Sequence, residues 1–150
     1  AAVRPNQIFA VSLTDDLLTD EQKRGVMEIV QRELLTPYGL RTLSPRDPRY
    51  MGRYEGSQAQ RDAAYHQGTA WPWLMGHFVE AYLRTYGTNN KTKNACRDFI
   101  QPLIEPLQKE DYIGSIAEIY DGSEPQRPKG AFAQAWSVAE LLRAYILVNS

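Results

Sequence analysis

Two acidic side chains stand in a glycine-flanked segment, GSIAEIYDG at residues 114–122. Glu118 and Asp121 have apolar neighbours, and carboxyl groups in such a setting can give or take protons. Hydrolysis of a glycosidic bond needs two carboxyl groups, one that protonates the leaving oxygen and one that activates water or attacks carbon. We assign the second role to Glu118 and interpret Asp121, which precedes Gly122, as a turn residue.

A second segment, YHQGTAWPW at residues 65–73, combines hydrogen-bonding and aromatic groups. A pyranose ring has apolar C–H faces that stack on aromatic planes and hydroxyl groups that need hydrogen bonds. The side chains that suit these needs are Tyr65, His66, Gln67, Trp71 and Trp73. The structural alternative is a helix start, with Pro72 near the first turn and the tryptophans in the core. We favour the sugar-binding interpretation.

Three further residues are candidates for the same site. Gln134 would hold the loop that carries Glu118. Trp136 would line either the site or the core, and the core is the favoured place. Arg41 lies in a polar stretch, where a surface ion pair would explain it equally well.

Apolar periodicity predicts helices that would position these groups. The expected ranges are residues 5–18, 19–36, 70–86, 92–108 and 132–148. Thr19 or Asp20 would cap the second helix, and Asn6 would cap the first, while Arg4 would fix a carboxylate. Long polar loops over residues 36–67 and 115–130 would meet at one end of the helices. No segment has a competing strand period, so the expected fold class is all-α.

Composition limits the partners. The 150 residues are 43% hydrophobic, enough for the core of one domain. The 17 basic residues nearly balance the 18 acidic ones. Because the chain has no excess of positive charge, we expect neither nucleic acid nor a membrane as a partner. The single Cys96 cannot form an internal disulfide, and His66 and His77 alone do not predict a metal site. The single cysteine favours a reducing, cytoplasmic setting. Neither a secretion signal nor a membrane-spanning run is visible, which favours a soluble protein.

Five motifs stand in one order along the chain: RPNQ at residues 4–7, TPYGLRTL at 36–43, YHQGT with WPW at 65–73, AEIYDG at 117–122 and QAWSVAE at 134–140. Together they resemble the glycogen debranching enzyme family, in the amylo-α-1,6-glucosidase domain of its bacterial and archaeal members. The resemblance extends from Arg4 to about Tyr145.

The resemblance implies an (α/α)6 toroid of twelve helices in the complete enzyme. It also implies hydrolysis, with inversion, of α-1,6-linked glucose at the branch points of glycogen-like glucans, without a metal or organic cofactor. Glu118 matches the family's general base. Five side chains fall in strings that border the family's sugar pocket: Tyr65, His66, Gln67, Trp71 and Trp136.

The family's general acid is an aspartate well upstream of the Arg-Pro-Asn motif, in a segment absent here. Residues 1–150 are therefore expected to be one unit, the carboxyl-terminal half of the toroid, truncated at its amino end and inactive alone. Glycogen or another branched α-glucan is the expected ligand. The upstream part of the polypeptide, or a second copy of the chain, would cover apolar helix faces left bare.

Two other classes of function remain open. One is a carbohydrate-binding fragment without chemistry, which the aromatic loops would permit. The other is a helical interaction scaffold, in which the tryptophans belong to the core.

Overall fold

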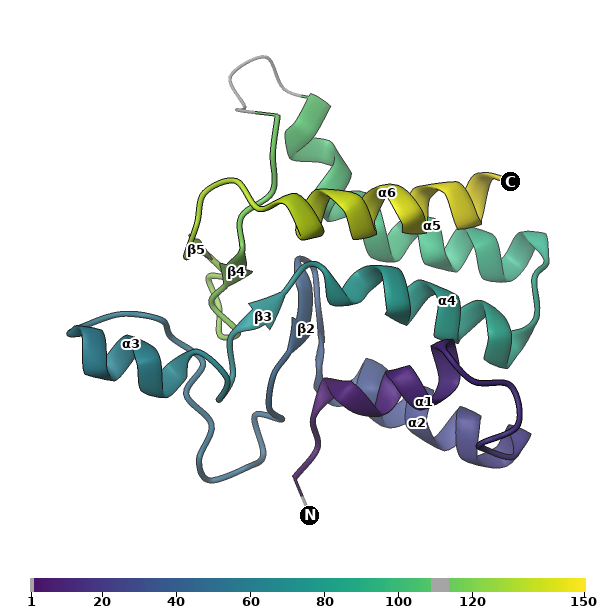
Figure 1. The fold of residues 1–150 in the computed structure, drawn as a ribbon, viewed down its shortest axis with the longest axis horizontal. Helices are drawn as coiled ribbons and strands as arrows, with labels where there is room; N and C mark the ends of the chain where they lie inside the picture. The colour runs from purple at the N-terminus through teal and green to yellow at the C-terminus, as the bar shows by residue number, and fades with distance from the viewer. Residues whose placement is uncertain (1, 109–113) are drawn as a thin grey trace.

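The computed structural model describes residues 2–108 and 114–150, and most of their regular structure is helical (Figure 1). The long helices are α2 (Asp20–Glu33), α4 (Leu74–Tyr86), α5 (Asn90–Ile104) and α6 (Ala135–Asn149). The shorter ones are the 3-10 helix η1 (Pro5–Ile8), α1 (Phe9–Ser12), α3 (Gln58–Ala64) and the 3-10 helix η2 (Glu105–Gln108).

A small antiparallel sheet accompanies the helices. Its strands lie in chain order: β1 (Leu35–Thr36), β2 (Gly39–Arg41), β3 (Ala70–Trp71), β4 (Ile119–Tyr120) and β5 (Pro128–Lys129). The expectation of an all-α fold is wrong in this respect, although the predominance of helix is confirmed. Strands of two or three residues are too short to display the alternation by which a strand is recognised.

Helix α4 is the centre of the helical part and packs against α1, α2, α5 and α6. In Figure 1, α4, α5 and α6 run side by side, with α1 and α2 on the opposite flank of α4. The largest fully buried side chains include Phe78 and Met75 of α4, Ile8 of η1, Met27 of α2 and Ile100 of α5. These residues recur at helical spacing, because each helix turns one apolar stripe toward the core.

Two predicted helix starts agree with the structure and two lie later than predicted. Thr19 caps α2 in a capping box with Gln22, as its sequence indicates. The third helix begins at Leu74, because Ala70 and Trp71 are taken up in β3. The last helix begins at Ala135, with Gln134 as its N-cap.

Two prolines, Pro102 and Pro106, lie in the range predicted for the fourth helix. Pro102 lies inside α5, and the chain changes to the 3-10 helix η2 at Glu105, close to the predicted end at Gln108. A proline lacks the N–H that an α-helix needs, so a change of helix type near two prolines is expected.

The first of the long loops contains a helix that the prediction omitted. Helix α3 starts after Ser57, whose side chain and that of Gln60 form a reciprocal capping box. The capping role predicted for Asn6 is wrong: Arg4 is the N-cap of η1 and offers no side-chain hydrogen bond there.

The sheet lies at one end of the helices and joins the two long loop regions (Figure 1). Leu40 of β2 pairs with Trp71, and Ala70 pairs with Tyr120 of β4. The segment before α4 is therefore fixed beside the segment that carries Glu118. Of the helices in the described ranges, none is long and apolar enough to cross a membrane.

Candidate active site

The carboxylate of Glu118, directly before β4, is held on both of its oxygens. Oε1 accepts a short hydrogen bond from the hydroxyl of Tyr65, and Oε2 accepts one from the backbone N–H of Ala131 at 3.0 Å. The backbone N–H of Glu118 also donates to the carbonyl of Ala131, at 2.9 Å. The side chain is half-buried, so its orientation is fixed while solvent still reaches it.

Tyr65 remains a hydrogen-bond donor over the physiological range. Burial, together with the hydrogen bond to Glu118 and the charge of that carboxylate, raises the pKa of the Tyr65 phenol well above its ordinary value. An un-ionised phenol beside a carboxylate directs its proton to that carboxylate. The hydroxyl proton therefore orients Glu118 and is not available to a ligand.

Two threonines shape the segment that carries Tyr65. Thr42 Oγ1 accepts the N–H of Gly68 at 2.8 Å and donates to the carbonyl of Thr69 at 3.1 Å. Thr69 Oγ1 in turn donates to the carbonyl of Tyr65 and accepts the indole N–H of Trp71, at 2.7 and 3.1 Å. The hydroxyls of Thr42 and Thr69 thus each accept one hydrogen bond and donate another within this turn, which makes it a rigid support.

Arg4 holds the same turn from the amino-terminal side. Its guanidinium donates to the carbonyls of Thr42 and His66, at 3.0 and 2.8 Å, and to Oε1 of Gln67 at 2.8 Å. The expectation that Arg4 fixes a carboxylate is therefore wrong. The amide oxygen of Gln67, predicted to bind sugar, is occupied by this arginine.

Aromatic rings continue from Tyr65 in an unbroken series, which we call the aromatic wall. The ring centroids of Trp71 and Tyr65 are 4.9 Å apart. The imidazole of His66 stacks on the Trp71 indole, with 5.5 Å between the ring centroids and 11° between the ring planes. Trp136 meets the edge of Trp71 at 5.9 Å and stacks on Trp73 at 5.2 Å. Phe9 also stacks on Trp73, with 5.9 Å between the ring centroids, and is the last ring that we include in the wall.

A cavity of about 230 Å³ lies against the aromatic wall. Trp71 is 5% exposed, whereas Trp136 is 45% exposed, so the core position favoured for Trp136 is wrong. The cavity is lined by Pro5, Asn6, Phe9, Thr42, His66, Trp71, Trp73, Leu74 and Trp136. Flat apolar faces with a few polar atoms at the edge match the two-sided chemistry of a sugar ring.

Five predicted residues lie outside this lining: Glu118, Tyr65, Gln67, Arg41 and Gln134. The guanidinium of Arg41 donates to the carbonyls of Gly122 and Glu33, at 2.8 and 3.3 Å, and thus ties β2 to the loop after β4. The side-chain oxygen of Gln134 accepts a hydrogen bond from the backbone N–H of Ala135 at the start of α6. Its own N–H donates to the carbonyl of Ile116 at 2.8 Å, so it does hold the segment before Glu118.

Asp121 is not a simple turn residue, so that interpretation is wrong. It is 1% exposed, and its Oδ1 accepts the backbone N–H of Tyr54 at 2.8 Å. Arg53 lies 4.0 Å from its other oxygen. The carboxylate therefore fastens the long loop to the end of β4 and is buried away from the cavity lining.

The sequence interpretation missed Phe9 as part of the wall and the Gly130–Ala131 turn as a partner of Glu118. Phe9 is one apolar residue among several in its helix, so its type gave no indication. Gly130 has a positive φ of 68°, and an isolated glycine after a strand is the type of signal that marks such a turn.

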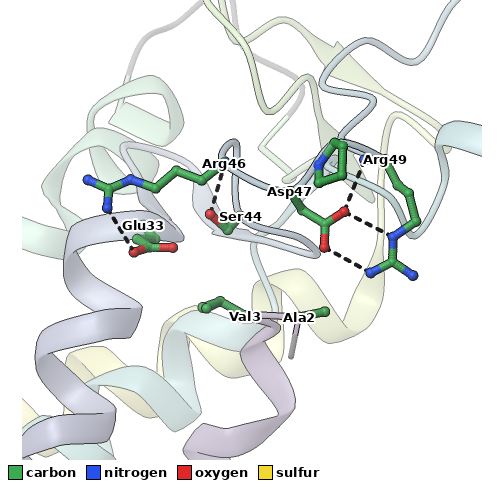
Figure 2. Close-up of a pocket in the computed structure, with 8 residues that line it drawn as sticks. Ala2, Val3, Glu33, Ser44, Arg46, Asp47 and Arg49 are labelled. Carbon is green, nitrogen blue, oxygen red and sulfur yellow. Dashed lines mark hydrogen bonds and ion pairs between the residues drawn. The ribbon is translucent and has the colours of Figure 1, made fainter.

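A second cavity, of about 420 Å³, lies between the chain start, the end of α2 and the loop around Asp47 (Figure 2). Glu33 at its edge is 7% exposed, and hydrogen bonds from Ser44 and Arg32 lower the pKa of its carboxyl. Arg49 holds both oxygens of Asp47, at 2.9 and 2.8 Å, and lowers the pKa of that carboxyl far below its usual range. These carboxylates are engaged by their own neighbours, and no aromatic ring is among the residues that line this cavity.

Comparison with known proteins identifies the family of the chain. The family model described as amylo-alpha-1,6-glucosidase matches residues 1–143. The glycogen debranching enzyme of Saccharomyces cerevisiae is 31% identical over 103 residues, which are 64% of this chain and 7% of the yeast protein. The chain thus matches only a small part of that relative's length. From the match over nearly its whole length, the chain belongs to the amylo-alpha-1,6-glucosidase family.

Proposed function

We propose that this chain is the carboxyl-terminal part of a glucosidase domain that hydrolyses α-1,6-linked glucose at the branch points of glycogen-like glucans. Glu118 is the general base and the aromatic wall binds the sugar. The observation that carries the proposal is the hydrogen bond from Tyr65 to Glu118, because it joins a fixed carboxylate to a series of stacked rings. Membership of the family and the yeast relative's name support the reaction type.

The two hydrogen bonds on Glu118 leave each oxygen a lone pair with which to accept a proton from water. In this proposal that water attacks the anomeric carbon on the face opposite the leaving oxygen, so the glycosidic C–O bond breaks with inversion. The water's proton goes to Glu118, and the leaving oxygen takes a proton from a second carboxyl group. Inverting enzymes keep the two carboxyl groups roughly 6.5–9.5 Å apart.

We assign the second carboxyl group to another part of a longer polypeptide. Asp121 is unsuited to the role, because it is 1% exposed and already accepts the N–H of Tyr54. The small share of the yeast enzyme that the chain matches supports a longer parent. For the 150 residues alone we therefore propose glucan binding without turnover.

We also propose that the helices form about half of an (α/α)6 toroid, with further helices against α6. The outward side chains of α6 support this, since Leu142, Tyr145 and Ile146 are 57, 50 and 56% exposed. Apolar side chains gathered on one helix face are typical of a surface that another element covers.

The test is glucose release from a branched limit dextrin by the full-length glucosidase and by its Glu118→Gln variant. General bases contribute roughly a hundredfold or more, so kcat should fall by at least that factor while KM changes little. Glu124→Gln is the matched control, because Glu124 is an exposed carboxylate in the loop after β4. Equal glucose release by the wild type and Glu118→Gln would remove Glu118 from this role.

A second measurement separates binding from scaffolding in the 150-residue chain. The aromatic wall contains all three tryptophans of the sequence, so a bound glucose oligomer should change the intrinsic fluorescence. Fluorescence that glucose oligomers leave unchanged would favour the interaction scaffold.

A further inference from the structure

The backbone at Gly130 comes unusually close to Glu118. A Cβ placed on Gly130 would lie 2.4 Å from Glu118 Oε2 and 3.2 Å from both its Cβ and its Cδ. The next residue, Ala131, donates the N–H that Oε2 accepts at 3.0 Å. One turn thus provides both the space for the carboxylate and the donor that orients it.

We propose that Gly130 is a positioning residue for Glu118, which holds its catalytic orientation because position 130 carries no side chain. The inference rests on the proposed function of Glu118. Tyr65, which lies between α3 and β3, binds the other oxygen, Oε1. Glu118 is therefore held between this segment and the Gly130–Ala131 turn. A methyl group at position 130 would push Oε2 away from Ala131 and rotate the carboxylate relative to Tyr65.

Backbone conformation alone explains a glycine here but not its proximity to Glu118. Gly130 has a φ of 68°, a region that other residues rarely adopt. Gly114 has the same φ of 68°, and a Cβ placed on it would meet nothing within 4 Å. A substitution at either glycine therefore causes the same backbone strain. Only at Gly130 would the new side chain also collide with the Glu118 carboxylate.

This pair gives a matched experiment in the full-length glucosidase, with Gly130→Ala compared with Gly114→Ala. Misplacement of a catalytic group by about 1 Å can cost a hundredfold, so kcat for glucose release should fall by at least about tenfold in Gly130→Ala. KM should stay within about twofold, because the aromatic wall is untouched. Gly114→Ala should keep the wild-type kcat, and similar kcat values for the two variants would overturn the inference.

Gly130→Asn covers the case in which Gly130→Ala fails to fold. Asparagine tolerates a positive φ better than other residues with a Cβ, so this variant retains the crowding with less strain. It should show the same loss of kcat, and a folded Gly130→Asn variant with wild-type kcat would contradict the proposal.

A double variant separates positioning from a general structural effect. In the Glu118→Gln background, Gly130→Ala should cause no further loss of kcat, because the group that it misplaces is already inactive. A further loss of the full size would mean that Gly130 acts on the fold. If Glu118→Gln alone keeps wild-type activity, the proposed function fails; if it is inactive while Gly130→Ala equals Gly114→Ala, only the present inference fails.

Discussion

At Glu118 a flexible acidic side chain is held in one orientation by groups from two distant segments. The phenol of Tyr65 binds one oxygen and the backbone of Ala131 binds the other. Charge-assisted hydrogen bonds such as these are shorter and stronger than neutral ones. In the proposed role of general base, Glu118 would need little rearrangement during the reaction, which is how positioning contributes to catalysis.

Trp136 is the residue at which stacking on a sugar is most directly testable. One face of its indole lies on Trp73, and 45% of the residue is exposed. We expect Trp136→Ala to weaken binding of glucose oligomers about tenfold, or about 1.4 kcal/mol, because the stacking surface is lost. Isothermal titration calorimetry measures the change, and Leu17→Ala, at a 65% exposed leucine before α2, is the control. Unchanged affinity in Trp136→Ala would exclude the indole from the binding surface.

Residue types alone predicted Glu118 and most rings of the candidate site, but not what holds them in place. Glu118 and Tyr65 were chosen for what their side chains can do, and the structure brings them into contact. The donor at Ala131 is a backbone N–H, which every residue except proline has, so the sequence contains no mark of it. The exposure of Trp136 was mispredicted because it lies at the start of an apolar helix, where burial is the ordinary expectation.

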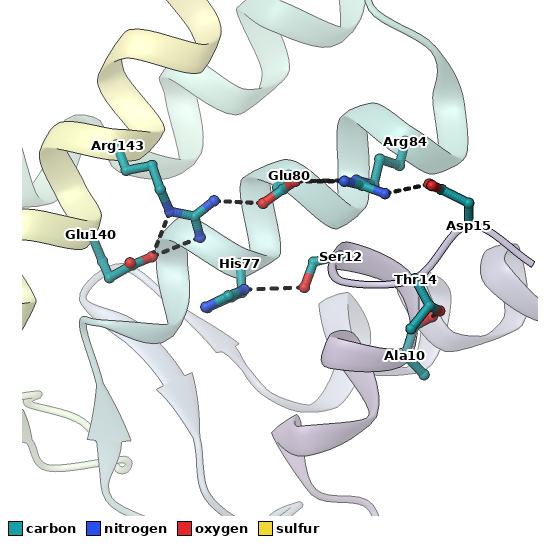
Figure 3. A network of polar contacts seen from close by, with 9 residues as sticks. All are labelled: Ala10, Ser12, Thr14, Asp15, His77, Glu80, Arg84, Glu140 and Arg143. Carbon is teal, nitrogen blue, oxygen red and sulfur yellow. Dashed lines mark hydrogen bonds and ion pairs between the residues drawn. The ribbon is translucent and has the colours of Figure 1, made fainter. Parts of the chain in front are cut away.

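Among the elements, α1, α4 and α6 are joined by a polar network that contains His77 (Figure 3). The imidazole Nδ1 lies 3.1 Å from Ser12 Oγ, and Arg143 of α6 pairs with Glu80 and Glu140 close by. Burial, and then the positive charge of Arg143, lower the pKa of His77 below the ordinary histidine value of 6.5, against the opposing effect of the two glutamates.

This shift makes stability depend on pH. Because the folded protein binds the proton less readily than the unfolded chain, the contribution of His77 is complete above pH 6.5 and is lost as pH falls through its lower folded pKa. We expect the free energy of unfolding in urea to decrease from pH 7.5 to pH 5.5, and His77→Gln to reduce that decrease. An identical decrease in the variant would show that His77 does not cause it.

Elements were predictable in proportion to their length. Helices α2, α4, α5 and α6 have 13 to 15 residues and show their apolar period clearly. The strands have only two or three residues each, and some of their pairings join segments far apart in sequence, such as Ala70 with Tyr120. Ser57 and Gln60 form a capping box that marks the start of helix α3 in the sequence. The helix was not predicted, because the residues around this box are mostly polar and show no apolar period.

Among residues 2–108 and 114–150, which the structure describes, no segment covers the outward face of α6. Its outward side chains are Val138, Leu142, Tyr145 and Ile146, while its charged residues Glu140 and Arg143 pair with each other, and Arg143 also pairs with Glu80 of α4. For the isolated 150-residue chain, we expect a second copy to cover this face. The chain should therefore self-associate as its concentration rises.

Sedimentation velocity over a concentration series tests this expectation. Leu142→Lys, which puts a charge at the centre of the face, should shift the protein toward monomer, and Gln31→Lys on the exposed side of α2 should not. A folded wild-type chain that stays monomeric at high concentration would contradict the expected pairing.

The central claim is that Glu118 works beside the aromatic wall, and a crystal structure with glucose tests it most directly. We predict that the ring stacks on the wall at Trp136 or His66 and that a Glu118 oxygen lies within roughly 3 Å of the anomeric hydroxyl or of a water beside it. Glucose bound elsewhere, with the Glu118 carboxylate turned to open solvent, would contradict the account.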